Sequence, residues 1–164
     1  GREGLVAAAI VSAPIDLAVT CRNMMRPRNL VYHRYILHQM KVEATAPGSG
    51  VTPQERSAIL KSSGVWEYDD VFIAPRYGFG TAERYYERCR PLRFMSAVRV
   101  PTLVIAALDD PWIPGHLYES FDWKGNGALY PRLLASGGHV GFHGTGSTHP
   151  WSDIAVCRFL SSGA

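Results

Sequence analysis

Residues 101–114 read PTLVIAALDDPWIP, and this stretch decides which class of fold the chain is expected to adopt. Thr102–Ala107 is a short, continuously apolar run that ends at Asp109-Asp110-Pro111, a pattern typical of a parallel strand buried on both faces. Two carboxylates therefore stand directly after a buried strand, where open α/β sheets place their ligand sites. The alternative is that either aspartate only caps the turn before the proline.

A histidine follows a second strand-like run further along the chain. Residues 128–134 (ALYPRLL) predict a poorer strand, because Pro131 cannot donate a ladder hydrogen bond. Gly137, Gly138 and His139 come next, and the glycines allow the tight backbone turn that exposes an imidazole at a sheet edge. Taken alone, His139 is better explained as a loop histidine bonded to the backbone than as a catalytic base.

A third apolar run, Leu5 to Val11 (LVAAAIV), precedes both of these strands. It could pass for a short signal-peptide core, but the Pro-Ile-Asp-Leu corner that begins at Pro14 favours a buried strand. The amphipathic stretch from Trp151 to Leu160 predicts a closing helix. Strands that alternate with helices predict an α/β fold with three mainly parallel strands and flanking helices.

A helical insertion, residues 16–95, is predicted between the first and second strands. Thr52 and Glu55 form a capping-box pattern before a helix that should end near Lys61, and Thr81 should cap a shorter helix over 82–89. Insertions this long usually act as functional lids. We expect its aromatic residues to form the lid core, with two of them lining an acyl pocket as substrate-binding residues. These two are Phe79 and Tyr86.

Composition limits the remaining classes. The chain has 164 residues, 46% apolar and 19% charged, which fits one globular domain, residues 1–164. A net charge of +3 is too small to make nucleic acid the main partner, and the arginines of residues 22–34 are better explained as a solvated lid face. No apolar run approaches the roughly 18 residues of a membrane helix. The cysteines are widely spaced, which favours a cytoplasmic protein. They are Cys21, Cys89 and Cys157.

Taken together, the motifs resemble the YheT-like (Emb8-type) branch of the α/β-hydrolase superfamily. The matching pieces, in the order of that family and over nearly the whole chain, are Val11-Ser12-Ala13-Pro14-Ile15-Asp16-Leu17, Glu67-Tyr68-Asp69-Asp70, Tyr77-Gly78-Phe79, Tyr85-Tyr86, Pro101-Thr102-Leu103, Asp109-Asp110-Pro111 and Gly137-Gly138-His139-Val140-Gly141-Phe142.

The resemblance implies an α/β-hydrolase fold, a Ser-His-Asp triad and a small-molecule ester or acyl substrate. The acid of the family usually stands four residues before the proline that ends its loop, here Pro114. The resemblance therefore assigns the acid to Asp110 rather than Asp109, with His139 as the base. The order of acid and then histidine is the one expected downstream of the serine.

The chain departs from this family in lacking a GxSxG nucleophile elbow. Gly48-Ser49-Gly50 is too short, and residues 144–147 follow the histidine. The resemblance places the elbow upstream of the strand at 5–11. The chain also has no initiator Met, so we expect it to be a C-terminal half whose partner is a missing N-terminal half. Ser12 is the nearest rival nucleophile, but it lacks elbow glycines and no helix follows it.

Two other functions compete with esterase chemistry. His139, His143, His149 and Asp110 could be imagined as a metal site, but four-apart histidines face one way only on a helix, and the surrounding glycines argue against a helix. We therefore expect no metal and no cofactor. The second alternative is a truncated or split hydrolase that acts as a binding or structural remnant, because an acid–base pair alone cannot form an acyl-enzyme. The coding sequence immediately upstream of Gly1 would discriminate this remnant from an active hydrolase, because a strand followed by GxSxG would indicate the hydrolase.

Overall fold

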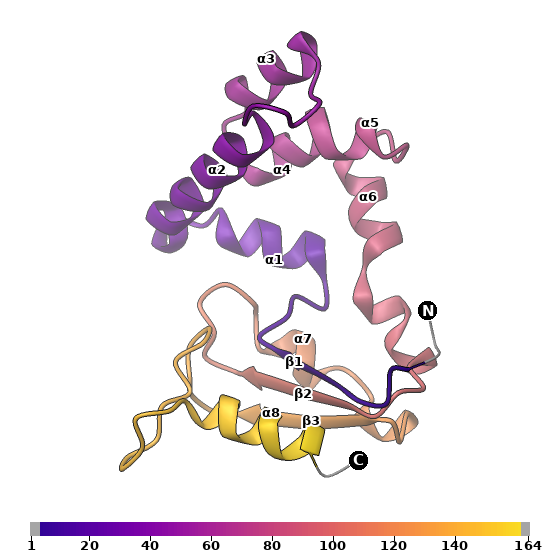
Figure 1. Ribbon diagram of the computed structural model, residues 1–164, viewed down its shortest axis with the longest axis vertical. Helices are drawn as coiled ribbons and strands as arrows, with labels where there is room; N and C mark the ends of the chain where they lie inside the picture. The colour runs from indigo at the N-terminus through magenta and orange to yellow at the C-terminus, as the bar shows by residue number, and fades with distance from the viewer. Residues whose placement is uncertain (1–3, 162–164) are drawn as a thin grey trace. The chain divides into compact units, whose positions relative to one another are not determined.

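The computed structural model describes residues 4–161, which form two compact units (Figure 1). Unit 1 consists of residues 4–16 and 91–161, and it contains the sheet. Unit 2 is the helical segment Leu17–Arg90, which occupies the part of the chain between the first and second strands.

Unit 1 is built on three parallel strands in the order β1-β2-β3. They are β1 (Ala8–Val11), β2 (Thr102–Ala107) and β3 (Leu129–Leu134). Thr102 pairs with Ala8 on one side and with Leu129 on the other, so β2 is the central strand, and all six of its residues are buried. The predicted α/β class with parallel strands is confirmed.

The first strand is shorter than the apolar run that predicts it. Pairing begins where the N–H of Ala8 donates to the carbonyl of Pro101 at 2.9 Å, immediately before β2 starts. Leu5 and Val6 lie before this point and are exposed, because no strand is present beside them within the described residues. Pro131 lies in β3, an edge strand of the described sheet, where a missing ladder donor is tolerated.

One face of the sheet is covered by α8 (Trp151–Ser161), the predicted closing helix (Figure 1). Leu103, Ile105 and Ala107 alternate along β2 and form a buried cluster with Phe142. Side chains of α8 pack against this cluster, so the loop that contains Phe142 is fastened to the core. The remaining elements of unit 1 are α7 (His116–Glu119) and 3₁₀ turns at Pro91–Arg93, Met95–Ala97 and Trp123–Gly125.

Unit 2 contains the other helices. They are α1 (Leu17–Met24), α2 (Leu30–Ala44), α3 (Pro53–Lys61), α4 (Val65–Tyr68), α5 (Ala74–Arg76) and α6 (Ala82–Cys89), with a 3₁₀ turn at Pro27–Asn29 and a π-helical turn at Asp69–Ile73. The predicted capping box is present: Thr52 accepts from the N–H of Glu55, and the Glu55 carboxylate accepts from the N–H of Thr52 at 2.7 Å. Thr81 caps α6, as expected.

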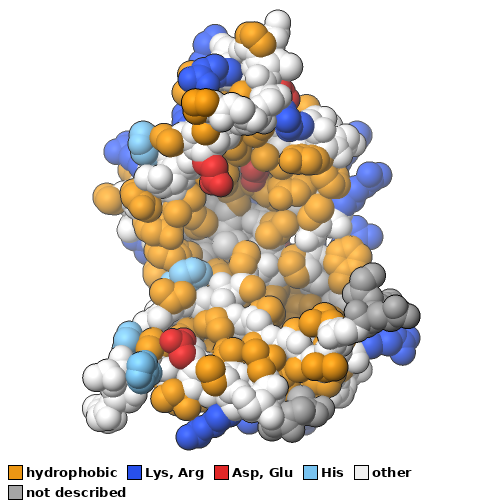
Figure 2. All heavy atoms as spheres, in the orientation of Figure 1, with side chains coloured by type: hydrophobic (Ala, Val, Ile, Leu, Met, Phe, Trp, Pro, Cys, Tyr) orange, Lys and Arg blue, Asp and Glu red, His pale blue; other side chains and the backbone are white. Residues whose placement is uncertain are grey.

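Hydrophobic side chains reach the surface of both units in the view of Figure 2. In unit 1 the most exposed are Val6, at 81%, and Val140, at 62%. Among residues 4–161, no helix is long and apolar enough to cross a membrane.

Candidate active site

The candidate site is built on a contact between an aspartate and a histidine that are 29 residues apart. Asp110 follows β2 and His139 follows β3, so adjacent parallel strands bring their loops to the same edge of the sheet. Oδ2 of Asp110 lies 2.8 Å from Nδ1 of His139. Asp110 is 5% exposed, whereas the His139 side chain is 27% exposed. Nε2 of this ring has no hydrogen-bond partner within residues 4–161.

The other carboxylate oxygen of Asp110 is held by its own loop. Oδ1 accepts hydrogen bonds from the backbone N–H groups of Trp112, at 2.8 Å, and Ile113, at 3.0 Å. Burial by itself would raise the pKa of Asp110, but the hydrogen bonds from His139 and from these N–H groups outweigh it and hold the pKa below its ordinary value. The group is therefore a carboxylate with fixed orientation at neutral pH.

Asp109 has a different partner from its neighbour. It is exposed, and its Oδ1 accepts the backbone N–H of Gly138 at 2.9 Å. One aspartate therefore binds the imidazole of His139, and the adjacent one binds the backbone directly before it. The sequence analysis had distinguished the two carboxylates only through the family resemblance, which assigns the acid to Asp110, and it gave no separate partner for Asp109.

Glycines shape the loop that carries His139. A Cβ on Gly137 would lie 2.6 Å from the ring of Phe142, which is too close for any other residue. Gly138 has a φ of 57°, the left-handed conformation that glycine adopts without strain. Phe142 is 5% exposed in the sheet core, so the close approach at Gly137 ties the loop to the core.

Ser12, the rival nucleophile, lies at the end of β1 and is 4% exposed. Its hydroxyl donates to the main-chain carbonyl of His139 rather than to the imidazole. Its φ is 49°, a conformation that costs a residue with a side chain about 1–3 kcal/mol. The geometry therefore makes Ser12 a support of the histidine loop and not a hydroxyl held against the base.

The ring of Trp112 packs beside His139, with centroids 4.2 Å apart and the planes at 55°. Trp112 thus contributes a backbone donor to Asp110 and an aromatic wall to the imidazole. Sequence reasoning missed this residue and the role of Ser12. The signal present in the sequence was position: Ser12 directly follows the first strand and Trp112 lies in the loop after the second, and both turns contain proline.

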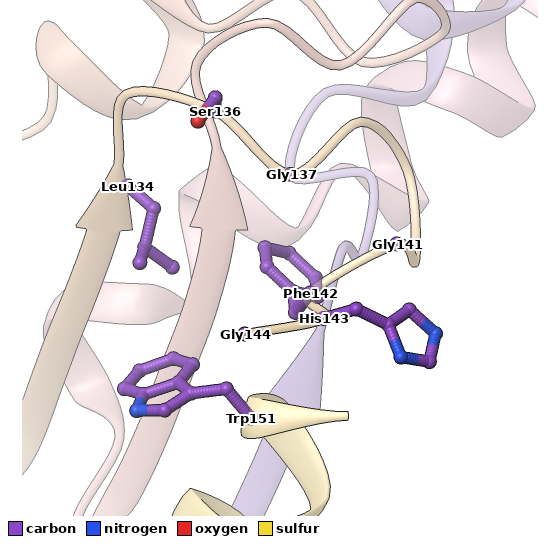
Figure 3. A pocket seen from close by; sticks show the side chains of 8 residues that line it. All are labelled: Leu134, Ser136, Gly137, Gly141, Phe142, His143, Gly144 and Trp151. Atoms are coloured by element: carbon purple, nitrogen blue, oxygen red, sulfur yellow. The ribbon is translucent and has the colours of Figure 1, made fainter. Parts of the chain in front are cut away.

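A pocket of about 360 Å³ is lined by residues of the histidine loop together with Leu134 at the end of β3 and Trp151 at the start of α8. Figure 3 shows Leu134, Phe142 and Trp151 around it, while His143 points away from them. Neither Asp110 nor His139 lines this pocket, so it is not the place where the two groups would act on a substrate. Among residues 4–161, no group of three His, Cys, Asp or Glu side chains could hold a metal ion.

Phe79 and Tyr86 both belong to unit 2. Phe79 is half-buried and packs against Tyr85 at 5.2 Å between centroids, and Tyr85 in turn contacts Tyr86 at 5.3 Å. Tyr86 is 4% exposed, and its hydroxyl donates to the carboxylate of Asp69. Burial raises the pKa of Asp69, and burial and the hydrogen bond with Asp69 raise that of Tyr86. Phe79 is therefore the more accessible of the two predicted substrate-binding residues.

Comparisons with known proteins identify several relatives. The chain is 32% identical to the YheT esterase of Escherichia coli over 161 residues, which cover 95% of this chain and 47% of that protein. It is 25% identical to an abhydrolase domain-containing protein of Dictyostelium discoideum over 93% of this chain and 39% of the relative. It is 28% identical to the phospholipase ABHD3 of Mus musculus over 84% of this chain and 34% of that protein.

The chain thus spans about half the length of the first of these relatives and less of the other two. No family model matches the chain. No solved structure matches it either.

Proposed function

We propose that this chain is the C-terminal part of an α/β-hydrolase and that it supplies the acid and the base of a serine esterase. The observation that carries the proposal is the contact of 2.8 Å between Asp110 and His139 at adjacent strand ends. The relatives named as an esterase and a phospholipase support ester hydrolysis as the reaction class.

In the proposed mechanism each group has one task. The carboxylate of Asp110 keeps the imidazole proton on Nδ1, which leaves the lone pair of Nε2 free to accept a proton. Nε2 of His139 takes the proton of a serine hydroxyl as that oxygen attacks the ester carbonyl, and then returns the proton to the departing alcohol. Between these two proton transfers His139 is an imidazolium cation, and the carboxylate of Asp110 stabilises its positive charge. A water molecule, activated by the same base, releases the acid from the acyl-enzyme.

The nucleophile and the oxyanion donors are proposed to come from an N-terminal half that precedes this chain in the same fold. Two facts support this part of the proposal. The chain spans 47% of the YheT esterase, and Ser12, the rival nucleophile at the end of β1, donates its hydroxyl to a main-chain carbonyl of the histidine loop. A catalytically inert, truncated or split hydrolase with a binding or structural role is the competing function. This competing function would be the correct one if no nucleophile elbow is encoded upstream of this chain.

Unit 2 is proposed to act as a lid, with Phe79 and Tyr86 contributing to an acyl pocket. Its aromatic row and its place between β1 and β2 in the chain support this role. We also propose a cytoplasmic location, supported by three cysteines that are all free thiols. These are Cys21, Cys89 and Cys157.

The test uses the full-length protein, meaning this chain together with the segment that supplies the nucleophile. His139→Ala should lower kcat for nitrophenyl esters by about 10³-fold or more. His143→Ala is the matched control, because His143 is an exposed histidine of the same loop. A His139→Ala variant as active as the wild type would refute the proposal. Residues 1–164 alone should not be labelled by a fluorophosphonate, and serine labelling of that chain would show that the nucleophile lies within it.

A further inference from the structure

The turn after β1 is held in place from several directions. The N–H of Ser12 donates to the carbonyl of Ile105 at 2.9 Å, which extends the ladder between β1 and β2. The carbonyl of Ala13, the residue after Ser12, accepts a hydrogen bond from the hydroxyl of Tyr118, and Tyr118 is 1% exposed. The carbonyl of Ile15 accepts the N–H of Leu92 at 3.0 Å.

This support explains how a serine keeps a left-handed conformation. A residue with a side chain stays at a φ of 49° only when its surroundings over-determine the backbone, and such strain gathers at functional sites. In this conformation the Ser12 hydroxyl points toward the main-chain carbonyl of His139, 127 residues away in the chain, and donates a hydrogen bond to it.

We propose that Ser12 is a positioning residue for the reaction, and that its hydroxyl sets the orientation of the His139 imidazole by holding the main-chain carbonyl of the same residue. This inference rests on the proposed function, because it assigns a role in the action of the base. Asp110 holds one ring nitrogen and Asp109 holds the N–H of Gly138. The hydrogen bond from the Ser12 hydroxyl is a third contact to this loop, and it prevents the loop from rotating about the two contacts made by the aspartates.

The hydroxyl cannot serve as nucleophile while it performs this task. Its proton is directed to a carbonyl oxygen, whereas an attacking serine must direct its proton to the base. If the loop can rotate, the protein stays folded but the imidazole is no longer aligned with the substrate. A displacement of about 1 Å is enough to lower the rate by up to about 100-fold.

Two substitutions separate positioning from simple structural support. Ser12→Ala removes the hydroxyl and keeps the strained φ, whereas Ser12→Gly removes the hydroxyl and relieves the strain. In the full-length protein, both should lower kcat about tenfold or more and leave KM within about twofold. Ser120→Ala is the control, because Ser120 also donates its hydroxyl to a main-chain carbonyl in unit 1, that of Leu117, away from the site.

A second readout does not depend on ester hydrolysis. Histidine ¹⁵N spectra report which ring nitrogen carries the proton, and we expect the Nδ1–H form of His139 to dominate in the wild type and to lose population in both Ser12 variants. If no ester is hydrolysed but the tautomer shifts, the proposed function fails and the positioning role stands. If Ser12→Gly restores both kcat and the tautomer, Ser12 is a structural residue only and the inference is overturned. Ser12→Gly alone decides the matter if Ser12→Ala does not fold.

Discussion

The backbone N–H of Gly138 donates to Oδ1 of Asp109 at 2.9 Å, one residue before the point where Asp110 reaches His139 at 2.8 Å. Two adjacent aspartates at the end of β2 thus hold two adjacent residues of the loop after β3. The carboxylate that contacts the imidazole belongs to Asp110 and the carboxylate that holds the loop backbone belongs to Asp109, so each contact can be removed by substitution without removing the other.

The first prediction concerns these aspartates. Asp110→Asn in the full-length protein should lower kcat by about 10³- to 10⁴-fold, because an amide can donate to Nδ1 and so favours the wrong tautomer. Asp109→Asn should cost only about threefold, since its Oδ1 still accepts the N–H of Gly138. Steady-state ester hydrolysis by both variants is the measurement. If Asp109→Asn alone were inactive, the assignment of the acid would be wrong.

The second prediction concerns Phe79. Phe79→Ala should change the preference between short and long acyl esters by about fivefold or more, because the side chain is half-buried and its loss disturbs the fold little. Tyr86 is a poorer probe, since it is 4% exposed and an alanine there would cost about 3–5 kcal/mol of folding free energy. The measurement is kcat/KM over a series of chain lengths. An unchanged profile would count against a lid that contacts the acyl chain.

The third prediction concerns the free edge of β1. Within the described residues β1 pairs only with β2, so one side of it presents unpaired backbone groups beside the exposed Val6. Residues 1–164 alone should therefore associate or precipitate. Val6→Lys should shift the chain toward monomer in size-exclusion chromatography, because a charge beside an edge strand discourages pairing.

Val140→Lys is the control for this test. It places the same charge on a residue that is 62% exposed in the histidine loop, away from the β1 edge. A wild-type chain that is a soluble monomer, or equal effects of both substitutions, would contradict the role of this edge.

The fourth prediction concerns pH and the helical unit. His33 is 4% exposed, and its Nε2 accepts the N–H of Val65 at 3.1 Å, at the start of α4, where Gly64 offers no side-chain cap. Burial lowers the pKa of His33, and the charge of Arg34 lowers it further. The folded state therefore binds fewer protons than the unfolded state, whose pKa is near 6.5.

Stability from His33 is thus present above about pH 6.5 and is lost as the pH falls from there through the lower folded pKa. The size of the loss is set by the difference between the folded and the unfolded pKa of His33, at about 1.4 kcal/mol for each pKa unit. His33→Gln keeps an acceptor without a titrating ring, so its free energy of unfolding should vary less between pH 5 and 7. His38→Gln, at an exposed position of α2, should keep the wild-type dependence. A wild-type curve that is flat over this range would contradict the prediction.

Local patterns predicted the regular elements well. The run Thr102–Ala107 is β2 with the predicted bounds, and the capping box at Thr52 and Glu55 starts α3. Such signals are local, because burial periodicity and helix caps involve residues close in sequence. The first strand was predicted three residues too long, since an apolar run continues to Leu5 but its pairing partner starts only at Thr102.

The sequence by itself determined the α/β class, the order of strands and helices, and that Asp110 and His139 each follow a strand. Spacing along the chain has no information on which loops meet, so only the tertiary structure decided that Asp109 holds Gly138, that Trp112 flanks the imidazole and that Ser12 supports His139. The physical reason is the parallel sheet: it brings the ends of β1, β2 and β3 to one edge, where hydrogen bonds form between residues as far as 127 positions apart.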